Sequence, residues 1–284
     1  MVAACLAGCS SDNEAQNPGT QTPETPRPMY VDIIDTPEGG DAAAPLFVNH
    51  RAGAPITTAT LSSFSMNYQG NKYDFTKTGE VWSTNAWPTG VPNDQKIDFY
   101  AYTSGTFNYN GGNPYVAFTV EEAASSQHDL LVAEHKQISY NDASGHVSLC
   151  FDHACAAVRF SVQITNTLRT QLGGDLSVTS IILRNVIKDG SYYYNTKSWT
   201  LGSTSTYFTL NNAPITVTNT PQQLSSNYLY MIPQTRAANG TTGTYLEINY
   251  TSGTAKTATI PLGINWEAGK SYPINIKLGT TTIK

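Results

Sequence analysis

Four residues near the middle of the chain have the types and spacing of a metal-binding motif. They are His146, Cys150, His153 and Cys155, and imidazole and thiolate groups are the usual ligands of zinc. On an extended strand, successive side chains point to opposite faces, so His146 and Cys150 would face away from the other two. No second close pair of cysteines or histidines adds ligands. We therefore expect no metal site and no cofactor.

The carboxylates also lack an arrangement suited to catalysis. Asp98 and Asp129 each stand alone beside an apolar residue, whereas acid–base hydrolysis needs two positioned carboxyl groups. GxSxG, P-loop and GxGxxG motifs are absent from the sequence. The net charge of −5 and the pI of about 5.5 disfavour a nucleic-acid-binding surface, which is usually basic. We expect a protein that is not an enzyme and binds no nucleic acid.

The composition predicts that strands, rather than helices, position these residues. Only 13% of the residues are charged, against about 25% in typical soluble domains, while 17 Tyr, 22 Gly and 15 Pro favour strands and turns. The predicted strands are 29–34, 45–49, 61–68, 72–75, 96–103, 115–120, 146–151, 156–164, 177–187, 191–194, 206–210, 214–218, 228–232, 244–250, 256–260 and 271–278. So many short strands predict an all-β fold of two β-sandwiches, with residues 29–153 as the N-terminal domain and 154–284 as the C-terminal domain.

The N-terminal residues resemble the end of a bacterial lipoprotein signal. Residues 1–9 are apolar and end in Leu-Ala-Gly-Cys, which is similar to the lipobox where Cys9 would receive lipid and become the first mature residue. Residues 10–28 are polar and rich in Pro, Thr and Ser, which predicts a disordered tether behind the anchor. The acidic stretch 10–14 resembles the signal that exports lipoproteins of the Bacteroides group to the cell surface.

An exported protein leaves Cys150 and Cys155 as the candidates for a disulfide. In one straight strand, residues five apart lie about 16 Å apart, whereas a disulfide requires Cα atoms within about 7 Å. A bridge would need a bend between them. We favour free, buried thiols over a bridge.

Aromatic residues gather in two stretches of the sequence. The first holds Trp82, Trp87, Tyr100, Tyr102, Phe107, Tyr109 and Tyr115, and the second is the run 192–194. Exposed rings could stack on sugar faces. Packing within the cores of the sandwiches is the favoured interpretation.

Several segments, taken together, resemble the fimbrillins of the Bacteroidales, the type V pilins that form lipoprotein-derived pili. The segments are LSSF at 61–64, Trp82 with WP at 87–88, IDFYAY at 97–102, QHDLLVA at 127–133, VSLCFDHACAAVRF at 147–160, MIPQ at 231–234 and WEAGKSY at 266–272. The resemblance implies two tandem transthyretin-like β-sandwich domains. It also implies export to the outer membrane, cleavage by an Arg-specific surface protease, and filling of the emptied groove by a donor strand from another pilin.

Arg51 and Ala52 lie where this resemblance places the cut. Small residues follow Arg51, which favours access by a trypsin-like enzyme. Arg27 is the rival site, but a cut there would release the lipid without removing a strand. An unprocessed loop arginine is the remaining alternative.

The resemblance implies that shaft subunits carry a long donor extension after the last strand. Here six residues follow Leu278, and they span at most about 20 Å. This predicts a tip or accessory subunit of a fimbrium, one that accepts a strand and adheres to a glycan or protein receptor. The alternative is a surface-anchored glycan-binding lipoprotein that does not polymerise.

Overall fold

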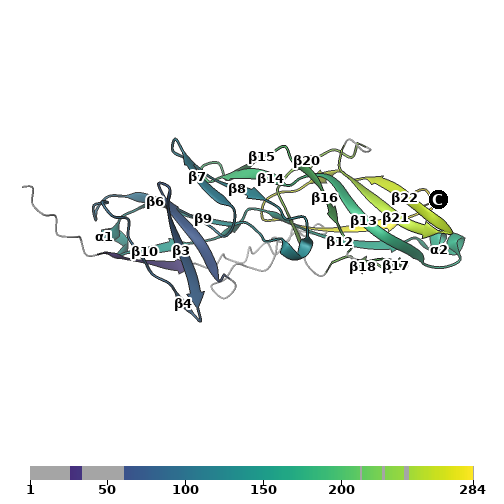
Figure 1. Ribbon diagram of the computed structural model, residues 1–284, viewed down its shortest axis with the longest axis horizontal. Coiled ribbons are helices and arrows are strands. Elements are labelled where there is room, and N and C mark those ends of the chain that lie inside the picture. Colours follow the sequence, from purple (N-terminus) through teal and green to yellow (C-terminus); the bar gives the residue numbers. More distant parts are fainter. Residues whose placement is uncertain (1–25, 34–60, 212, 226–227, 240–242, 284) are drawn as a thin grey trace, which may run out of the picture.

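The computed structural model describes residues 26–33, 61–211, 213–225, 228–239 and 243–283. These residues form an all-β protein, as predicted, with only short helical segments (Figure 1). Within them, no helix is long and apolar enough to cross a membrane. Each predicted strand in these ranges overlaps an observed strand, whereas 45–49 lies outside them.

The structure has 24 strands among the described residues, together with two α-helices and one 3-10 helix. Up to residue 153 the elements are β1 (Pro28–Ile33), β2 (Ser63–Tyr68), β3 (Asn71–Thr78), β4 (Val81–Trp82), β5 (Asn85–Ala86), β6 (Ile97–Tyr102), β7 (Thr106–Asn110), β8 (Asn113–Thr119), η1 (Ala124–Ser126), β9 (Leu131–Ile138), α1 (Tyr140–Ala143), β10 (His146–Leu149) and β11 (Asp152–His153). The later elements are β12 (Ala156–Ile164), α2 (Asn166–Leu172), β13 (Leu176–Ile187), β14 (Asp189–Tyr193), β15 (Ser198–Leu201), β16 (Ser205–Thr209), β17 (Ile215–Val217), β18 (Gln222–Gln223), β19 (Leu229–Met231), β20 (Thr235–Arg236), β21 (Tyr245–Ser252), β22 (Thr254–Pro261), β23 (Ile264–Asn265) and β24 (Ser271–Leu278).

Two sheets enclose the first hydrophobic core. One has the strand order β10-β1-β5, and the other has the order β11-β9-β6-β2-β3-β4. Fully buried Met29, Phe75, Phe99 and Phe151 lie in this core, which draws only on residues before β11. Alternation along the strands explains the arrangement, because every second side chain points inward.

A second, larger core lies among the later strands. One sheet has the order β18-β12-β19, with β24 parallel to β12 over its whole length, and another has the order β16-β13-β21-β22. Buried side chains from β12, β13 and β21 alternate inward between these sheets. The chain passes from the first group of sheets to the second between β11, which pairs with β9, and β12, which pairs with β24.

One four-stranded sheet joins the two parts of the chain. Its order is β15-β14-β8-β7, so a hairpin from before residue 153 pairs with one from after it. Tyr100, Tyr102 and Phe118 pack in the larger core together with residues of β12 and β13. The division into domains 29–153 and 154–284 stays a prediction, because the sheets and the larger core continue across it.

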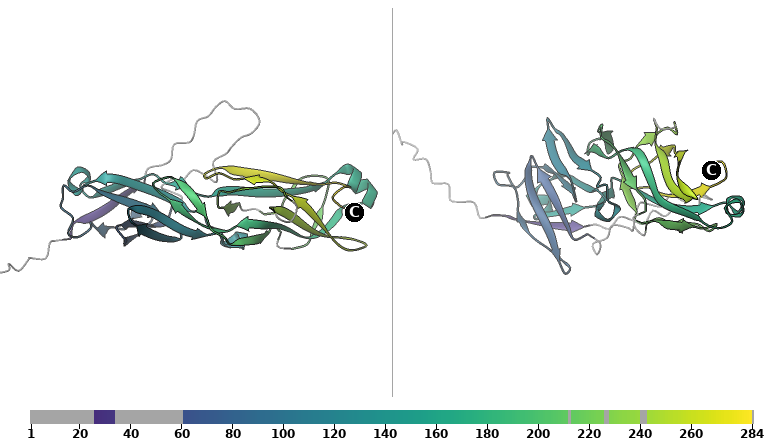
Figure 2. Two further views of the ribbon diagram at one scale, coloured as in Figure 1. Left: turned by 90° about the horizontal axis from the view of Figure 1, so that it is seen from above. Right: turned by 45° about the vertical axis from the view of Figure 1, so that its right-hand side comes forward.

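The molecule is elongated, with β1 and α1 near one end and α2 near the other (Figures 1 and 2).

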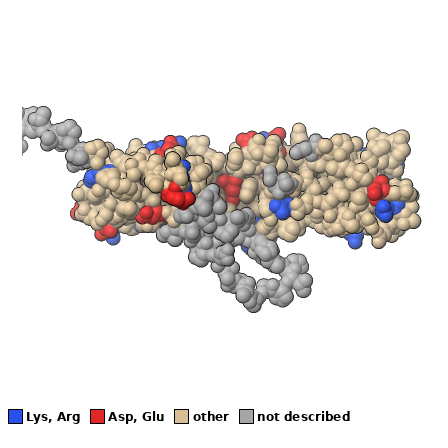
Figure 3. All heavy atoms as spheres, turned by 90° about the horizontal axis from the view of Figure 1, so that it is seen from below, with Lys and Arg blue, Asp and Glu red and all other residues tan. Residues whose placement is uncertain are grey.

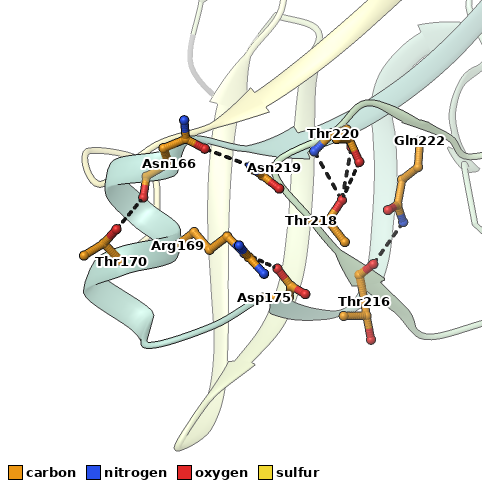
Figure 4. A network of polar contacts seen from close by, with 9 residues as sticks. All are labelled: Asn166, Arg169, Thr170, Asp175, Thr216, Thr218, Asn219, Thr220 and Gln222. Atoms are coloured by element: carbon orange, nitrogen blue, oxygen red, sulfur yellow. Dashed lines mark hydrogen bonds and ion pairs between the residues drawn. The ribbon is translucent and has the colours of Figure 1, made fainter.

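A network of polar contacts lies at the α2 end (Figure 4). In it, Arg169 Nε donates to Asp175 at 2.6 Å and Asn219 donates to Asn166 at 2.9 Å. Charged side chains are scattered over the face seen in Figure 3.

Candidate functional site

In the first strand, buried apolar side chains alternate with exposed side chains. In β1, Met29, Val31 and Ile33 are 0%, 6% and 8% exposed, whereas Tyr30 and Asp32 face outward. The three apolar side chains are part of the first core. Because alternate residues of a strand share a face, this hexapeptide supplies one complete apolar row to the sandwich.

The backbone of β1 is paired on both sides. Residues 30–33 run parallel to β10, with Tyr30 opposite His146 and Ile33 opposite Leu149. Residues 28–29 pair antiparallel with β5. Without β1, the inward face of the core and the adjoining edges of β10 and β5 would lose their partners.

Outward-facing side chains of β1 contact β10 as well. The rings of Tyr30 and His146 stack with centroids 4.9 Å apart. Asp32 Oδ2 lies 3.0 Å from His146 Nδ1. Both partners of that pair are half exposed, so the contact adds little stability and mainly favours this register.

Arg27 is fixed to the folded protein immediately before β1. Its guanidinium donates to the carbonyl oxygens of Val91 at 2.7 Å and Pro88 at 3.3 Å, bonds to Asn93, and lies over the Tyr140 ring. The prediction of a loose tether through residue 28 is therefore wrong for residues 27–28. The sequence reasoning missed this because the partners of Arg27 are more than 60 positions away.

Gly145 allows the close approach of β1. Ser139 caps α1 by accepting from the Asp142 N–H at 3.2 Å, and Ser144 and Gly145 follow with φ of 51° and 82°. Tyr30 N–H then donates to the Gly145 carbonyl at 2.9 Å. A Cβ on Gly145 would lie 2.5 Å from the Pro28 carbonyl oxygen, so the contact requires glycine.

The four residues whose types and spacing resemble a metal-binding motif, His146, Cys150, His153 and Cys155, do not form one cluster. His146 is paired with Asp32, whereas His153 is hydrogen-bonded to Asp129. Among the described residues, no group of three or more His, Cys, Asp and Glu lies close enough to hold a metal ion.

The two later cysteines form no disulfide with each other, and they differ in burial. Cys155 is buried and Cys150 is exposed, so the expectation of two buried thiols is wrong for Cys150. Cys150 lies between β10 and β11, and its neighbours Leu149 and Phe151 both point into the core. The alternation of the extended chain turns the Cys150 side chain outward.

Asp129, His153 and Cys155 form a buried polar cluster. Burial raises the pKa of Asp129, which the hydrogen bond from His153 only partly offsets. Burial and the nearby Asp129 also raise the pKa of the Cys155 thiol well above its usual range. A protonated, fully buried thiol is a poor nucleophile. The bond between His153 and Asp129 links β11 to the residues just before β9.

Most of the aromatic residues pack in the cores, as the favoured interpretation stated. The buried ones are Trp87, Tyr100, Tyr102, Tyr192 and Tyr194. Trp82 and Phe107 are partly buried against the two cores. Tyr109, at 43% exposed, is an exception.

Cys9, Arg51 and Ala52 lie outside the described residues. Lipidation at Cys9 and cleavage between Arg51 and Ala52 therefore stay predictions.

The chain was compared with protein families, curated proteins and solved structures. A model of the fimbrillin-like family matches residues 50–284, and no curated protein matches. A fimbrial protein from Bacteroides vulgatus ATCC 8482 has 19% identity and a TM-score of 0.56, covering 91% of this chain and 96% of its own. A proposed cell adhesion protein from Bacteroides ovatus ATCC 8483 has 15% identity and a TM-score of 0.55, covering 92% and 94%.

At these identities the solved structures show a shared fold. The family match is independent of them and extends over most of the chain. This chain therefore belongs to the fimbrillin-like family.

Proposed function

We propose that the protein is a subunit of a lipoprotein-derived fimbrium, in which β1 is removed and replaced by a strand from another pilin. The observation that carries this proposal is the position of β1. It fills one apolar row of the first core and pairs on both sides, yet residues 34–62 separate it from β2 in the sequence. A cut within that segment would detach the strand and leave a groove that favours strand addition.

Cleavage after Arg51 is the processing step that we propose. The family match begins at residue 50, next to this arginine. The rival Arg27 is half-buried, and its guanidinium is bound to backbone carbonyl groups and Asn93. A protease would have to pull Arg27 out of these contacts before it could bind the side chain.

The ends of the molecule suit assembly in line. β1 lies near one end, and α2 with residues 279–283 lies near the other (Figure 1). A strand offered from the far end of a neighbouring subunit would extend the assembly along the long axis. Before cleavage, lipid on Cys9 would hold the subunit at the outer membrane on the cell surface.

A tip or accessory position is the finer part of the proposal. Residues after β24 turn back on the larger core: Ile283 is 1% exposed, and its N–H donates to the Gly279 carbonyl at 3.0 Å. These residues would have to unpack before they could serve as a donor strand. The subunit is therefore better suited to accept a strand than to donate this segment.

Digestion of a soluble protein starting at Ser10 with an Arg-specific protease tests this function. We expect one new product beginning at Ala52, which keeps the larger core folded and joins shaft pilins in an SDS-resistant complex. Arg51→Ala should abolish both that product and the complex, whereas Arg27→Ala should leave both in place. Formation of the complex by uncut protein, or failure of the cut protein to join any pilin, would contradict the proposal.

A further inference from the structure

A small cavity lies on the first part of the molecule, and no residue of β1 lines it. Its volume is about 160 Å³, and three tyrosines, three glutamines, Lys96, Ile97 and Asp98 line it. We call it the tyrosine–glutamine pocket. Its walls come from the β2–β3 turn, the start of β6, the end of β9 and the tip of the β7–β8 hairpin.

The β2–β3 turn places the first glutamine in an uncommon backbone conformation. Tyr68 pairs with Asn71, so Gln69 and Gly70 form a two-residue turn, with φ of 46° and 86°. Two positive φ values are typical of a type I′ turn, where Asn-Gly is favoured. Glutamine gains no local advantage there, but its longer side chain reaches the pocket.

A β-bulge places the second glutamine. Ile97 pairs with Ile138 and Phe99 with His135, so two residues of β9 lie opposite Asp98 alone. Gln137 has a φ of 56° in this bulge. Bulges often redirect a side chain beside a functional site, and positive φ in a residue other than glycine is uncommon.

Asp98 organises the polar wall. Its Oδ1 accepts from the Gln137 backbone N–H at 2.9 Å and from Gln137 Nε2 at 3.1 Å. Its Oδ2 accepts from the Tyr100 hydroxyl at 3.4 Å. A carboxylate has about four acceptor positions, so Asp98 retains capacity for another hydroxyl group.

Of the three tyrosines, Tyr109 presents an exposed ring to the pocket. Tyr68 and Tyr100 are buried, whereas Tyr109 is 43% exposed at the hairpin tip. Burial and the neighbouring Asp98 raise the pKa of Tyr100, so its hydroxyl stays protonated. The Tyr109 ring beside amide and carboxylate groups matches the apolar C–H face and the hydroxyl groups of a sugar.

We infer that the tyrosine–glutamine pocket binds a single neutral sugar ring. Lys96 and Asp98 contribute one charge of each sign, so the lining favours an uncharged ligand. The volume is well below the about 300–1,000 Å³ usual for drug-sized ligands. The inference rests on the proposed function in one respect, because sugar binding would serve adhesion. The pocket itself is present in the single folded subunit and does not depend on assembly.

Saturation-transfer NMR on the soluble protein starting at Ser10 tests the inference. The probes are galactose, mannose, fucose, N-acetylglucosamine and glucuronate. We expect a neutral sugar to bind, and Tyr109→Ala to weaken that binding about tenfold through loss of the exposed ring. Gln137→Gly should weaken it similarly, because glycine accepts the positive φ and keeps the backbone N–H that bonds Asp98, while the side chain with its amide is lost.

Tyr207→Ala is the matched control. Tyr207 is 48% exposed on β16, outside the pocket, and its removal should leave sugar binding unchanged. Unfolding midpoints of the three variants should confirm that they fold. Binding of glucuronate alone, binding that survives both pocket substitutions, or no binding of any neutral sugar would overturn the inference. Failure of the Ala52 product to join pilins would contradict only the assembly role.

Discussion

A protein that begins at Ala52 is expected to be far less stable than one that begins at Pro26. The shorter protein lacks β1, and with it Met29, Val31 and Ile33 of the first core. Burial of each such side chain stabilises by about 1.5–3 kcal/mol, so their loss costs roughly 5–9 kcal/mol. That is comparable to the total stability of a typical domain, about 5–15 kcal/mol.

Denaturant unfolding of the two proteins measures this difference. The protein beginning at Pro26 is the control, because it keeps β1 and the contacts of Arg27 and lacks only the residues before them. Hydrogen exchange should show the loss confined to the first core, with slow exchange retained in β12 and β24. Equal unfolding midpoints would contradict the role of β1 as an integral strand.

Gly145→Ala is expected to destabilise the full protein by about 3 kcal/mol or more. The residue has a φ of 82°, and its added Cβ would lie 2.5 Å from the Pro28 carbonyl oxygen and 3.0 Å from the Tyr140 ring. Positive φ alone costs an alanine roughly 1–2 kcal/mol. The remaining cost comes from pushing β1 away from β10.

Gly112→Ala is a matched control for the backbone term. Gly112 has nearly the same φ, 83°, but a Cβ there meets nothing within 4 Å. Unfolding midpoints should therefore fall more for Gly145→Ala than for Gly112→Ala in the protein that contains β1. The difference between the two substitutions should be smaller in the protein beginning at Ala52, because that protein lacks Pro28. An equal effect of both substitutions would show that β1 does not press on Gly145.

Strands with regular alternation were predictable from the sequence. The pattern in 29–34 predicted β1 to within one residue, and 156–164 and 271–278 match β12 and β24. These segments alternate apolar and polar residues over most of their length, so the local pattern and the packing agree. The resemblance to fimbrillins also rested on sequence motifs and is confirmed by the family match.

β9 was not predicted, and its bulge explains why. Residues Glu134, Lys136 and Gln137 interrupt the alternation near the end of β9, where two residues lie opposite Asp98. The same bulge builds one wall of the tyrosine–glutamine pocket. That pocket could not be found from sequence spacing, because turns and strands more than 60 residues apart bring its lining together.

The candidate functional site, β1 and the residues that hold it, was only partly predictable from the sequence. The sequence indicated the strand and, through the resemblance, its removal. The contacts that hold it, from Arg27 to the carbonyls near residue 90 and from the Tyr30 N–H to the Gly145 carbonyl, depend on long-range packing. Glycine at position 145 carried no signal beyond a turn, since positive φ and close approach are visible only in the fold.

The most direct test of strand replacement adds a strand back from outside. A peptide of residues 26–34 is mixed with the protein that begins at Ala52, and its affinity and the unfolding midpoint are measured. The account predicts binding and recovery of the midpoint toward that of the protein beginning at Pro26, whereas the same peptide with Val31→Asp should do neither, because the buried charge is costly. Failure of the native peptide to bind, or equal binding of the Val31→Asp peptide, would contradict an acceptor groove in this position.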